Sequence, residues 1–578
     1  MDLTKPLLKI TDLYKILARN LDHEAAIRYF SLTKDLNSKK YFYLKILSIT
    51  YDNHNWITIP KSTSITELRF LNGNNFPPIP LWNGVEKIVF GFHFNVELTQ
   101  LSLPESITFI HFGSKFNNPV NKANLPKSIE KLVFGVDFNQ EMNDLPDSLK
   151  ILLFSNDYYG AFNKPLDKLP RGLRTLDTGR SFNFEVDKLP NVETLALGFR
   201  FRHEIKSLPK TIKNLSLTSG YDQDLSCLPP IKKLRIGGAT SGSISILPNC
   251  IEELFLTTCP DSPPDKLPDS LRILTMDYTF ERAIRIRCPH LTHLTFGNSF
   301  NSPIEELPQT LTHLVFGHSF NKYLDKLPNS ITHLTLDYAF NPCENLIKNI
   351  VDNRRPWSHQ KGNKGSRKGS RRGNGKKQPQ LRTKPHSKRR SEVGLPPYMY
   401  KWPTSLKSLI FPDNCTFNQP LDLTKTKLEY LYLGYCYSYP LDKLPESLLH
   451  LELYGPYRRP LDQLPKGLRH LILHGHYNQS LDSLPESLYE LKISKGFNLR
   501  VDNLPPNLDR LSLGGDFDHT LDKLPPNLTQ LVLGHAFNKK VDKLPLSLTY
   551  LQVGNSFKES LDKVPTSCRV KRISKSFM

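Results

Sequence analysis

The chain lacks the features of several common protein classes. None of its eight cysteines forms a Cys-x-x-Cys pair and their spacings do not repeat, which argues against a disulfide framework and a zinc site. No run of about eighteen apolar residues occurs, so we expect no segment to span a membrane. The stretch from Met1 to Ile10 lacks the basic start and apolar run of a signal peptide. We therefore expect an intracellular, cytoplasmic protein with reduced cysteines.

Catalytic motifs are missing as well. The sequence contains no Gly-x-Ser-x-Gly, no phosphate-binding loop and no His-Glu-x-x-His. His293, His313 and His333 stand twenty residues apart, and three aligned imidazoles could hold a metal ion. However, their Thr-His-Leu step is part of a repeated pattern, so a ladder on the surface is the simpler interpretation. We expect neither enzymatic activity nor a cofactor.

One segment contains no acidic residues. Between Arg354 and Ser391 there are 15 Lys and Arg and no Asp or Glu, in a chain of formal net charge +21. With almost no apolar side chains it cannot form a core, so residues 353–398 are predicted to be a disordered insertion. It could be a solvated spacer, a nuclear-import signal that makes a nuclear location possible, or a salt-sensitive contact for nucleic acid. The residues for import or phosphate contact are Lys384, Lys388, Arg389 and Arg390.

What the chain has in abundance is a repeat of about twenty residues. The unit from Phe537 to Gly554 gives the template F-N-x-x-L-D-x-L-P-x-x-L-x-x-L-x-L-G. Its proline recurs every twenty residues from Pro445 to Pro565, and at spacings of 19 to 24 from Pro60 to Pro328. The pattern predicts one array over residues 59–345 and a second over 399–578, since internal periods of this length indicate solenoids.

The template also predicts how a coil is built. Leu531 and Leu533 alternate with outward positions, which indicates a short strand with one buried side. A twenty-residue coil leaves too little chain for a full helix, and its Leu-Pro step favours extended backbone. We expect Phe to form an interior stack, as at Phe320 and Phe537, and the following Asn to hydrogen-bond backbone between coils. A single coil buries too little to fold alone, so neighbours must share their cores.

These residues resemble the FNIP repeat family, named for a Phe-Asn-x-Pro tetrapeptide. Close forms stand at 116–119, 162–165, 300–303 and 417–420. The resemblance implies a leucine-rich-repeat-like solenoid with a parallel β-sheet. The repeat of this chain departs from the common leucine-rich pattern, because its Asn lies two places later. We therefore do not carry over the turn geometry of that pattern.

The first fifty residues do not follow the repeat. Apolar residues at three- and four-residue steps between Leu13 and Phe30 predict two short helices. The segment resembles an F-box, which would dock a Skp-type adaptor of a cullin ubiquitin ligase. The alternative is a plain cap that shields the first coil. The residues for adaptor binding are Leu13, Ile16, Leu17 and Leu21.

These features predict a protein that binds another protein. The strand side of the solenoid would select the target, and with a working F-box the chain would be the substrate receptor of a ubiquitin ligase. A scaffold or decoy without a ligase link, and a nucleic-acid-associated protein acting through the insertion, are the alternatives. The residues for the target-binding face are Thr312, His313, Val315, Thr529, Gln530 and Val532.

Overall fold

The alternating leucines form short strands with one buried side. In β24 (Gln530–Leu533), Leu531 and Leu533 are buried while Gln530 and Val532 are partly exposed. The computed structural model describes residues 46–50, 66–72, 84–217, 221, 223–237, 247–257, 267–276, 283–324, 326–342 and 401–573. Successive strands of the main sheet pair in parallel, with leucine beside leucine, as at Leu511 and Leu531. The predicted solenoid of parallel strands is confirmed.

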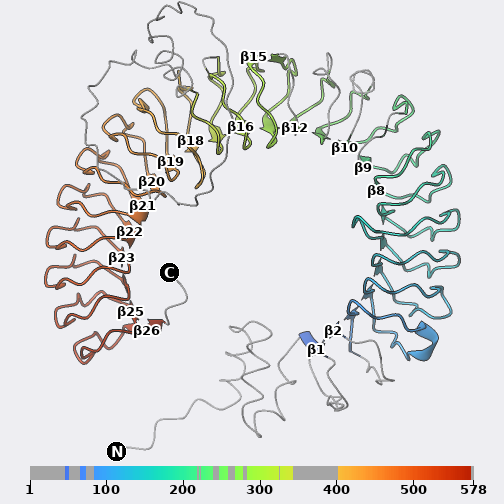
Figure 1. Ribbon diagram of the computed structural model, residues 1–578, viewed down its shortest axis with the longest axis horizontal. Helices are drawn as coiled ribbons and strands as arrows, with labels where there is room; N and C mark the ends of the chain where they lie inside the picture. Colours follow the sequence, from blue (N-terminus) through green and yellow to red (C-terminus); the bar gives the residue numbers. More distant parts are fainter. Residues whose placement is uncertain are drawn as a thin grey trace, which may run out of the picture. The chain divides into compact units, whose positions relative to one another are not determined.

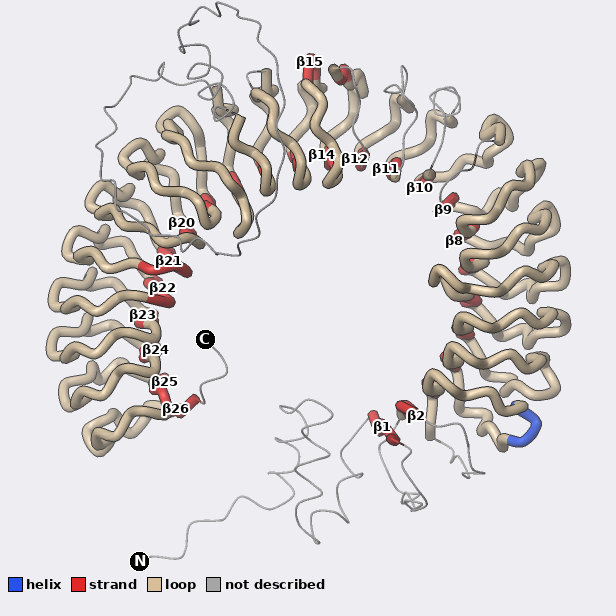
Figure 2. Tube along the Cα trace, viewed as in Figure 1, coloured by secondary structure: helices blue, strands red, loops and turns tan. Residues whose placement is uncertain are grey.

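Two compact units make up the chain: unit 1, Met1–His318, and unit 2, Ser319–Met578. In each unit the strands line the inner side of a curved stack of coils (Figure 1). Between the strands, the described residues are almost entirely in turns and extended segments (Figure 2), as expected for coils too short to hold a helix.

Unit 1 contains one 3-10 turn, η1 (Leu98–Gln100), among its described residues. The strands of its main sheet are β1 (Ile46–Thr50), β2 (Glu67–Asn72), β3 (Lys87–Val89), β4 (Phe109–His111), β5 (Lys131–Val133), β6 (Ile151–Leu153), β7 (Thr175–Asp177), β8 (Thr194–Leu197), β9 (Asn214–Leu217), β10 (Lys233–Ile236), β11 (Glu253–Leu256), β12 (Ile273–Met276), β14 (His293–Phe296) and β16 (His313–Phe316). A separate parallel pair is formed by β13 (Ile284–Arg285) and β15 (Ile304–Glu306).

Unit 2 repeats the same architecture. Its strands are β17 (His333–Leu336), β18 (Ser408–Ile410), β19 (Tyr430–Leu433), β20 (His450–Leu453), β21 (His470–His476), β22 (Glu490–Lys495), β23 (Arg510–Leu513), β24, β25 (Tyr550–Gly554) and β26 (Arg569–Ile573).

Phenylalanine rings stack through the interior of each unit. In unit 1 the rings of Phe116 and Phe138 lie 6.0 Å apart and within 1° of parallel. In unit 2 Phe517, Phe537 and Phe557 follow one another at 6.0 and 5.8 Å. All five side chains are at most 1% exposed, so each ring is removed from water by the coils on both sides. The predicted phenylalanine stack is therefore confirmed.

The asparagine after each phenylalanine links one coil to the next. The backbone N–H of Asn139 donates to Oδ1 of Asn117 at 2.9 Å, and that of Asn163 donates to Oδ1 of Asn139 at 2.9 Å. In unit 2 Asp518 takes the same place and accepts from the N–H of Asn538 at 2.9 Å. These bonds give otherwise unpaired backbone groups a partner at the turn, which confirms the predicted role of the asparagine.

The template glycine follows the strand because two backbones meet there. A Cβ atom added to Gly113 would lie 1.7 Å from the carbonyl oxygen of Gly91. Only a residue without a side chain permits this approach between coils.

The coils on either side of the basic insertion stack directly on each other. Within unit 2, β17 pairs in parallel with β18, so that Leu334 lies beside Leu409. The rings of Phe340 and Phe417 stack 6.0 Å apart across the same junction. The repeat therefore continues in register past the insertion, whose residues 353–398 lie outside the described part of the chain.

The N-terminal segment differs in one place from its prediction. Residues Ile46–Thr50, within the segment 1–50 predicted to be helical, form β1, which pairs in parallel with β2. A strand here extends the sheet by one coil before the predicted start at residue 59. The two predicted helices, and the choice between an F-box and a cap, fall outside the described residues and stay predictions.

Candidate functional site

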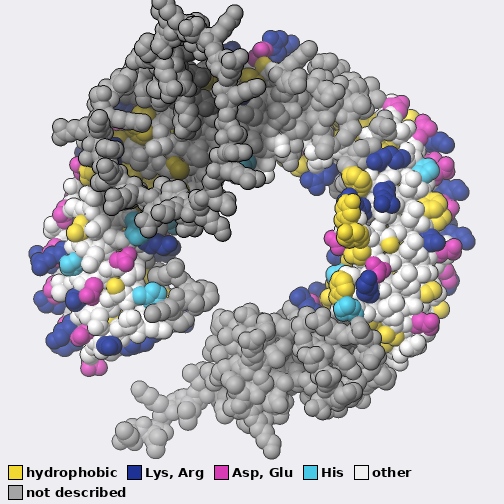
Figure 3. Space-filling model, in the orientation of Figure 1, with side chains coloured by type: hydrophobic (Ala, Val, Ile, Leu, Met, Phe, Trp, Pro, Cys, Tyr) yellow, Lys and Arg dark blue, Asp and Glu magenta, His cyan; other side chains and the backbone are white. Residues whose placement is uncertain are grey.

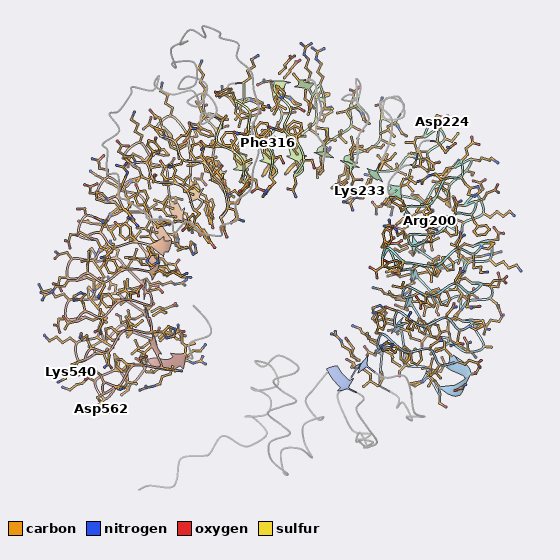
Figure 4. All side chains as sticks on the ribbon, viewed as in Figure 1. Arg200, Asp224, Lys233, Phe316, Lys540 and Asp562 are labelled. Carbon is orange, nitrogen blue, oxygen red and sulfur yellow. The ribbon has the colours of Figure 1, made fainter. Side chains whose placement is uncertain are left out.

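The outward side chains of the strands form the candidate binding surface. Because successive side chains alternate across a strand, the two residues on either side of the first buried strand leucine point away from the core. The register brings these positions into two columns that cross the strands. In Figure 4, Lys233 of β10 lies on this inner side of unit 1, whereas Asp224 lies on the outer side.

The six residues predicted for the target-binding face occupy these columns or precede them. Their side chains are all partly exposed. In unit 1 the hydroxyl of Thr312 donates to the carbonyl of Thr292 at 3.0 Å, and Val315 lies beside Thr295. In unit 2 the Thr529 hydroxyl donates to Asp509 at 2.8 Å. The remaining three residues are His313, Gln530 and Val532. They lie in two separate groups, one in each unit, and their part in binding stays a prediction.

Histidine rings stack in a ladder on the side of the strands that faces away from the core. The rings of His293 and His313 stack at 4.2 Å, and those of His450 and His470 at 5.3 Å. No group of three or more His, Cys, Asp or Glu among the described residues is arranged to hold a metal ion.

A hydrogen-bonded network of aromatic and acidic side chains covers β19 to β21 in unit 2. Glu452 stands at its centre with a side chain that is 16% exposed. The Tyr430 hydroxyl donates to its Oε1 at 3.0 Å, and His450 Nε2 lies 2.8 Å from the same oxygen. His474 Nε2 lies 3.0 Å from Oε2. We call Tyr430, His450, Glu452 and His474 the Glu452 network.

The hydrogen bonds of this network favour the charged carboxylate. The bond from His450, with those from His474 and Tyr430, lowers the pKa of Glu452 to about 2 despite its partial burial. Burial and the neighbouring Glu452 carboxylate raise the pKa of the Tyr430 hydroxyl, which therefore stays protonated and donates at neutral pH. Both oxygens of Glu452 have partners, so the side chains are held in one arrangement.

Further aromatic groups border the network. The Tyr432 hydroxyl donates to Asp413, and burial followed by this bond raises the pKa of that hydroxyl. The rings of His470 and Tyr489 meet edge to face at 6.0 Å, and His470 Nδ1 lies 3.0 Å from Glu490. Tyr489 is 39% exposed and lies at the rim.

Sequence reasoning missed this site although part of its signal was visible. Tyr430, His450 and His470 stand twenty residues apart and lie side by side in the sheet. The sequence assigned the histidines to the repeat pattern, and it gave no sign that Glu452 would accept bonds from coils on both sides. A search for tyrosine and histidine at outward template positions would have found the cluster.

Unit 1 has a groove of different character on its strand side, which is the inner side of the curved stack. It has a volume of about 740 Å³ and is lined by residues of β2 to β6. Val89, Phe109 and Ile151 contribute apolar surface, and Lys131 Nζ lies 5.1 Å from the centre of the Phe109 ring. Burial, and then the charge of Lys131, lower the pKa of His111 in the same groove. Figure 3 shows hydrophobic side chains gathered along this inner side of unit 1.

The described cysteines are free thiols. Burial raises the pKa of Cys288 to about 11 and that of Cys415 to about 12, so neither is a reactive thiolate at neutral pH. Within the part of the chain that the structure describes, no helix is long and apolar enough to cross a membrane.

Two predicted sites fall outside the described residues. One is the set for adaptor binding, Leu13, Ile16, Leu17 and Leu21. The other is the basic set for import or phosphate contact, Lys384, Lys388, Arg389 and Arg390.

Comparisons with known proteins agree with this geometry. The FNIP repeat family matches residues 116–157, 288–319, 300–338 and 457–496. Among solved structures, CroV588, described as a novel circular LRR protein, is 27% identical with a TM-score of 0.59, and the match covers 85% of this chain and 76% of that one. No curated protein sequence matches the chain.

Two further solved structures share less with it. The TLR13–ssRNA13 complex is 14% identical with a TM-score of 0.45, covering 88% of this chain and 72% of that one. YopM from Yersinia enterocolitica is 15% identical with a TM-score of 0.30, covering 88% and 85%. The matched segments show that the chain contains FNIP repeats at several positions, and its parallel, in-register coils form a leucine-rich-repeat-like solenoid.

Proposed function

We propose that the chain is a non-catalytic binding protein whose strand side recognises another protein. The observation that carries the proposal is the Glu452 network. Its side chains are fixed by mutual hydrogen bonds, so a partner would not have to order them on binding. Tyrosine is enriched among the residues that contribute most to protein interfaces, and Tyr430, Tyr432 and Tyr489 lie together here. Solenoids offer such extended inner surfaces for binding.

The test is comparative affinity purification of the intact chain. The double variant Tyr489→Ala/Lys492→Glu changes two exposed side chains beside the network without breaking it. The matched control is Lys540→Glu, a charge reversal on the outer side of unit 2 (Figure 4). A partner held by the wild type and the control, and lost from the double variant, supports the proposal. Equal recovery from all three contradicts it.

The finer proposal is a ubiquitin-ligase substrate receptor that acts inside the cell. It is supported by the F-box resemblance of residues 13–36, in which Leu13, Ile16, Leu17 and Leu21 dock a Skp-type adaptor. Purified adaptor should be captured by the wild type and by Lys540→Glu, and should be lost from Ile16→Ala/Leu17→Ala. Capture by the double variant at wild-type level would leave the N-terminal segment as a cap only.

A further inference from the structure

The groove of unit 1 contains cations without carboxylate partners. Arg69 pairs with Glu67, and Lys150 pairs with Glu130, both at 2.5 Å. Lys87 and Lys131 have no carboxylate partner among the described residues, and both line the groove. Every carboxylate of the lining is already paired, so the groove has a surplus of two positive charges.

The surplus charges lie on either side of an aromatic ring. Lys87 of β3, Phe109 of β4 and Lys131 of β5 are direct neighbours across the sheet. Neighbouring strands are about 4.8 Å apart, so the two lysines start about 10 Å apart along the stack. The parallel column of Val89, His111 and Val133 runs beside them. The apolar side chains of Val89, Phe109 and Ile151 thus lie in the same groove as two cations at a fixed spacing.

We propose that this groove binds an acidic peptide segment with apolar side chains, in an extended conformation that crosses the strands. A polyproline-like chain rises about 3.1 Å per residue and repeats every three residues. Carboxylates at positions i and i+3 therefore match the spacing of Lys87 and Lys131, and an apolar residue between them covers Phe109. The charge of the lining selects an acidic partner over a basic one.

This groove is a separate surface from the Glu452 network, so each proposal can fail without the other. The groove proposal requires unit 1 lysines and apolar side chains, and it makes no use of unit 2.

The experiment measures binding of fluorescent twelve-residue peptides to the full chain by polarisation. Each triplet of the probe contains one Glu, one Leu and one Ser, so that Glu stands at every third position. Matched peptides replace Glu by Lys, replace Leu by Ser, or shuffle the glutamates. We expect the acidic apolar probe to bind at least tenfold more tightly than each of the three, and its affinity to fall with added salt.

Variants of the chain locate the site. Lys87→Glu/Lys131→Glu should weaken the probe at least tenfold, and Val89→Thr/Ile151→Thr should weaken it severalfold while keeping the β-branched shape. Lys168→Glu, an exposed charge reversal elsewhere in unit 1, should leave affinity unchanged. Circular dichroism checks that each variant is folded. If Lys87→Glu/Lys131→Glu is not folded, Lys87→Gln/Lys131→Gln takes its place.

Three outcomes would overturn the proposal. The first is that the basic peptide binds as tightly as the acidic probe. The second is that Lys168→Glu weakens the probe as much as Lys87→Glu/Lys131→Glu does. The third is that the wild type self-associates in sedimentation and Lys87→Glu/Lys131→Glu does not.

Discussion

The interiors of the two units are built in the same way, but their surfaces differ. Phe116 in unit 1 and Phe517 in unit 2 are both fully buried and stack on their neighbours at about the same separation. At outward positions, unit 1 presents lysines and aliphatic groups around Phe109, whereas unit 2 presents the Glu452 network. The template constrains only the side chains that neighbouring coils share, so the outward positions are free to differ and can carry separate binding specificities.

The largest expected effect tests whether the interiors are equivalent. Phe116→Ala and Phe517→Ala should each lower the free energy of unfolding by about 3–5 kcal/mol, because each leaves a cavity between two coils. Urea denaturation followed by circular dichroism measures the loss, and hydrogen exchange shows which unit loses protection. Phe92→Ala is the control, since Phe92 is 50% exposed. A much smaller loss in one unit would mean that the interiors are not equivalent.

The next effect concerns the surface of unit 2. Glu452→Gln should cost up to about 3 kcal/mol at pH 7, because lowering the pKa of Glu452 from 4.5 to about 2 corresponds to about 3 kcal/mol of stability. Because the folded pKa lies below the unfolded one, the contribution is present above about pH 4.5 and is lost as the pH falls toward 2.

Denaturation of the wild type and Glu452→Gln at pH 7 and pH 3 checks this prediction. The gap between their stabilities should narrow at the lower pH. A gap that stays constant would show that the network does not hold the charged carboxylate.

A smaller effect tests the link between coils. Asn139→Ala should cost about 1 kcal/mol, because the N–H of Asn163 loses its acceptor. Asn139→Asp should be nearly neutral, since Asp518 fills the same role in unit 2. Thermal unfolding of both variants gives the comparison. If Asn139→Asp destabilised as much as Asn139→Ala, the link between coils would accept aspartate in unit 2 but not in unit 1.

The smallest effect concerns the interior of unit 2, where tyrosine replaces phenylalanine in three successive coils. The Tyr477 hydroxyl is buried and has no hydrogen-bond partner among the described residues. Tyr477→Phe should therefore change the free energy of unfolding by less than about 1 kcal/mol, toward greater stability.

Tyr457→Phe is the matched control for that substitution. Its hydroxyl donates to the carbonyl of Tyr439 at 3.0 Å, so its loss should destabilise by about 1 kcal/mol. Denaturation curves of the two variants should shift in opposite directions, and a destabilised Tyr477→Phe would indicate a partner for that hydroxyl.

The sequence by itself determined the solenoid, the strand positions and the roles of Phe and Asn. Each follows from residues within one coil and from the need of twenty residues to share burial with their neighbours. It did not predict the strand Ile46–Thr50, because the first fifty residues do not follow the repeat template. Only the tertiary structure decided which outward side chains meet. Three side chains hydrogen-bond Glu452, and Lys87 and Lys131 leave a surplus of positive charge in the groove. Both features depend on the register between residues about twenty positions apart.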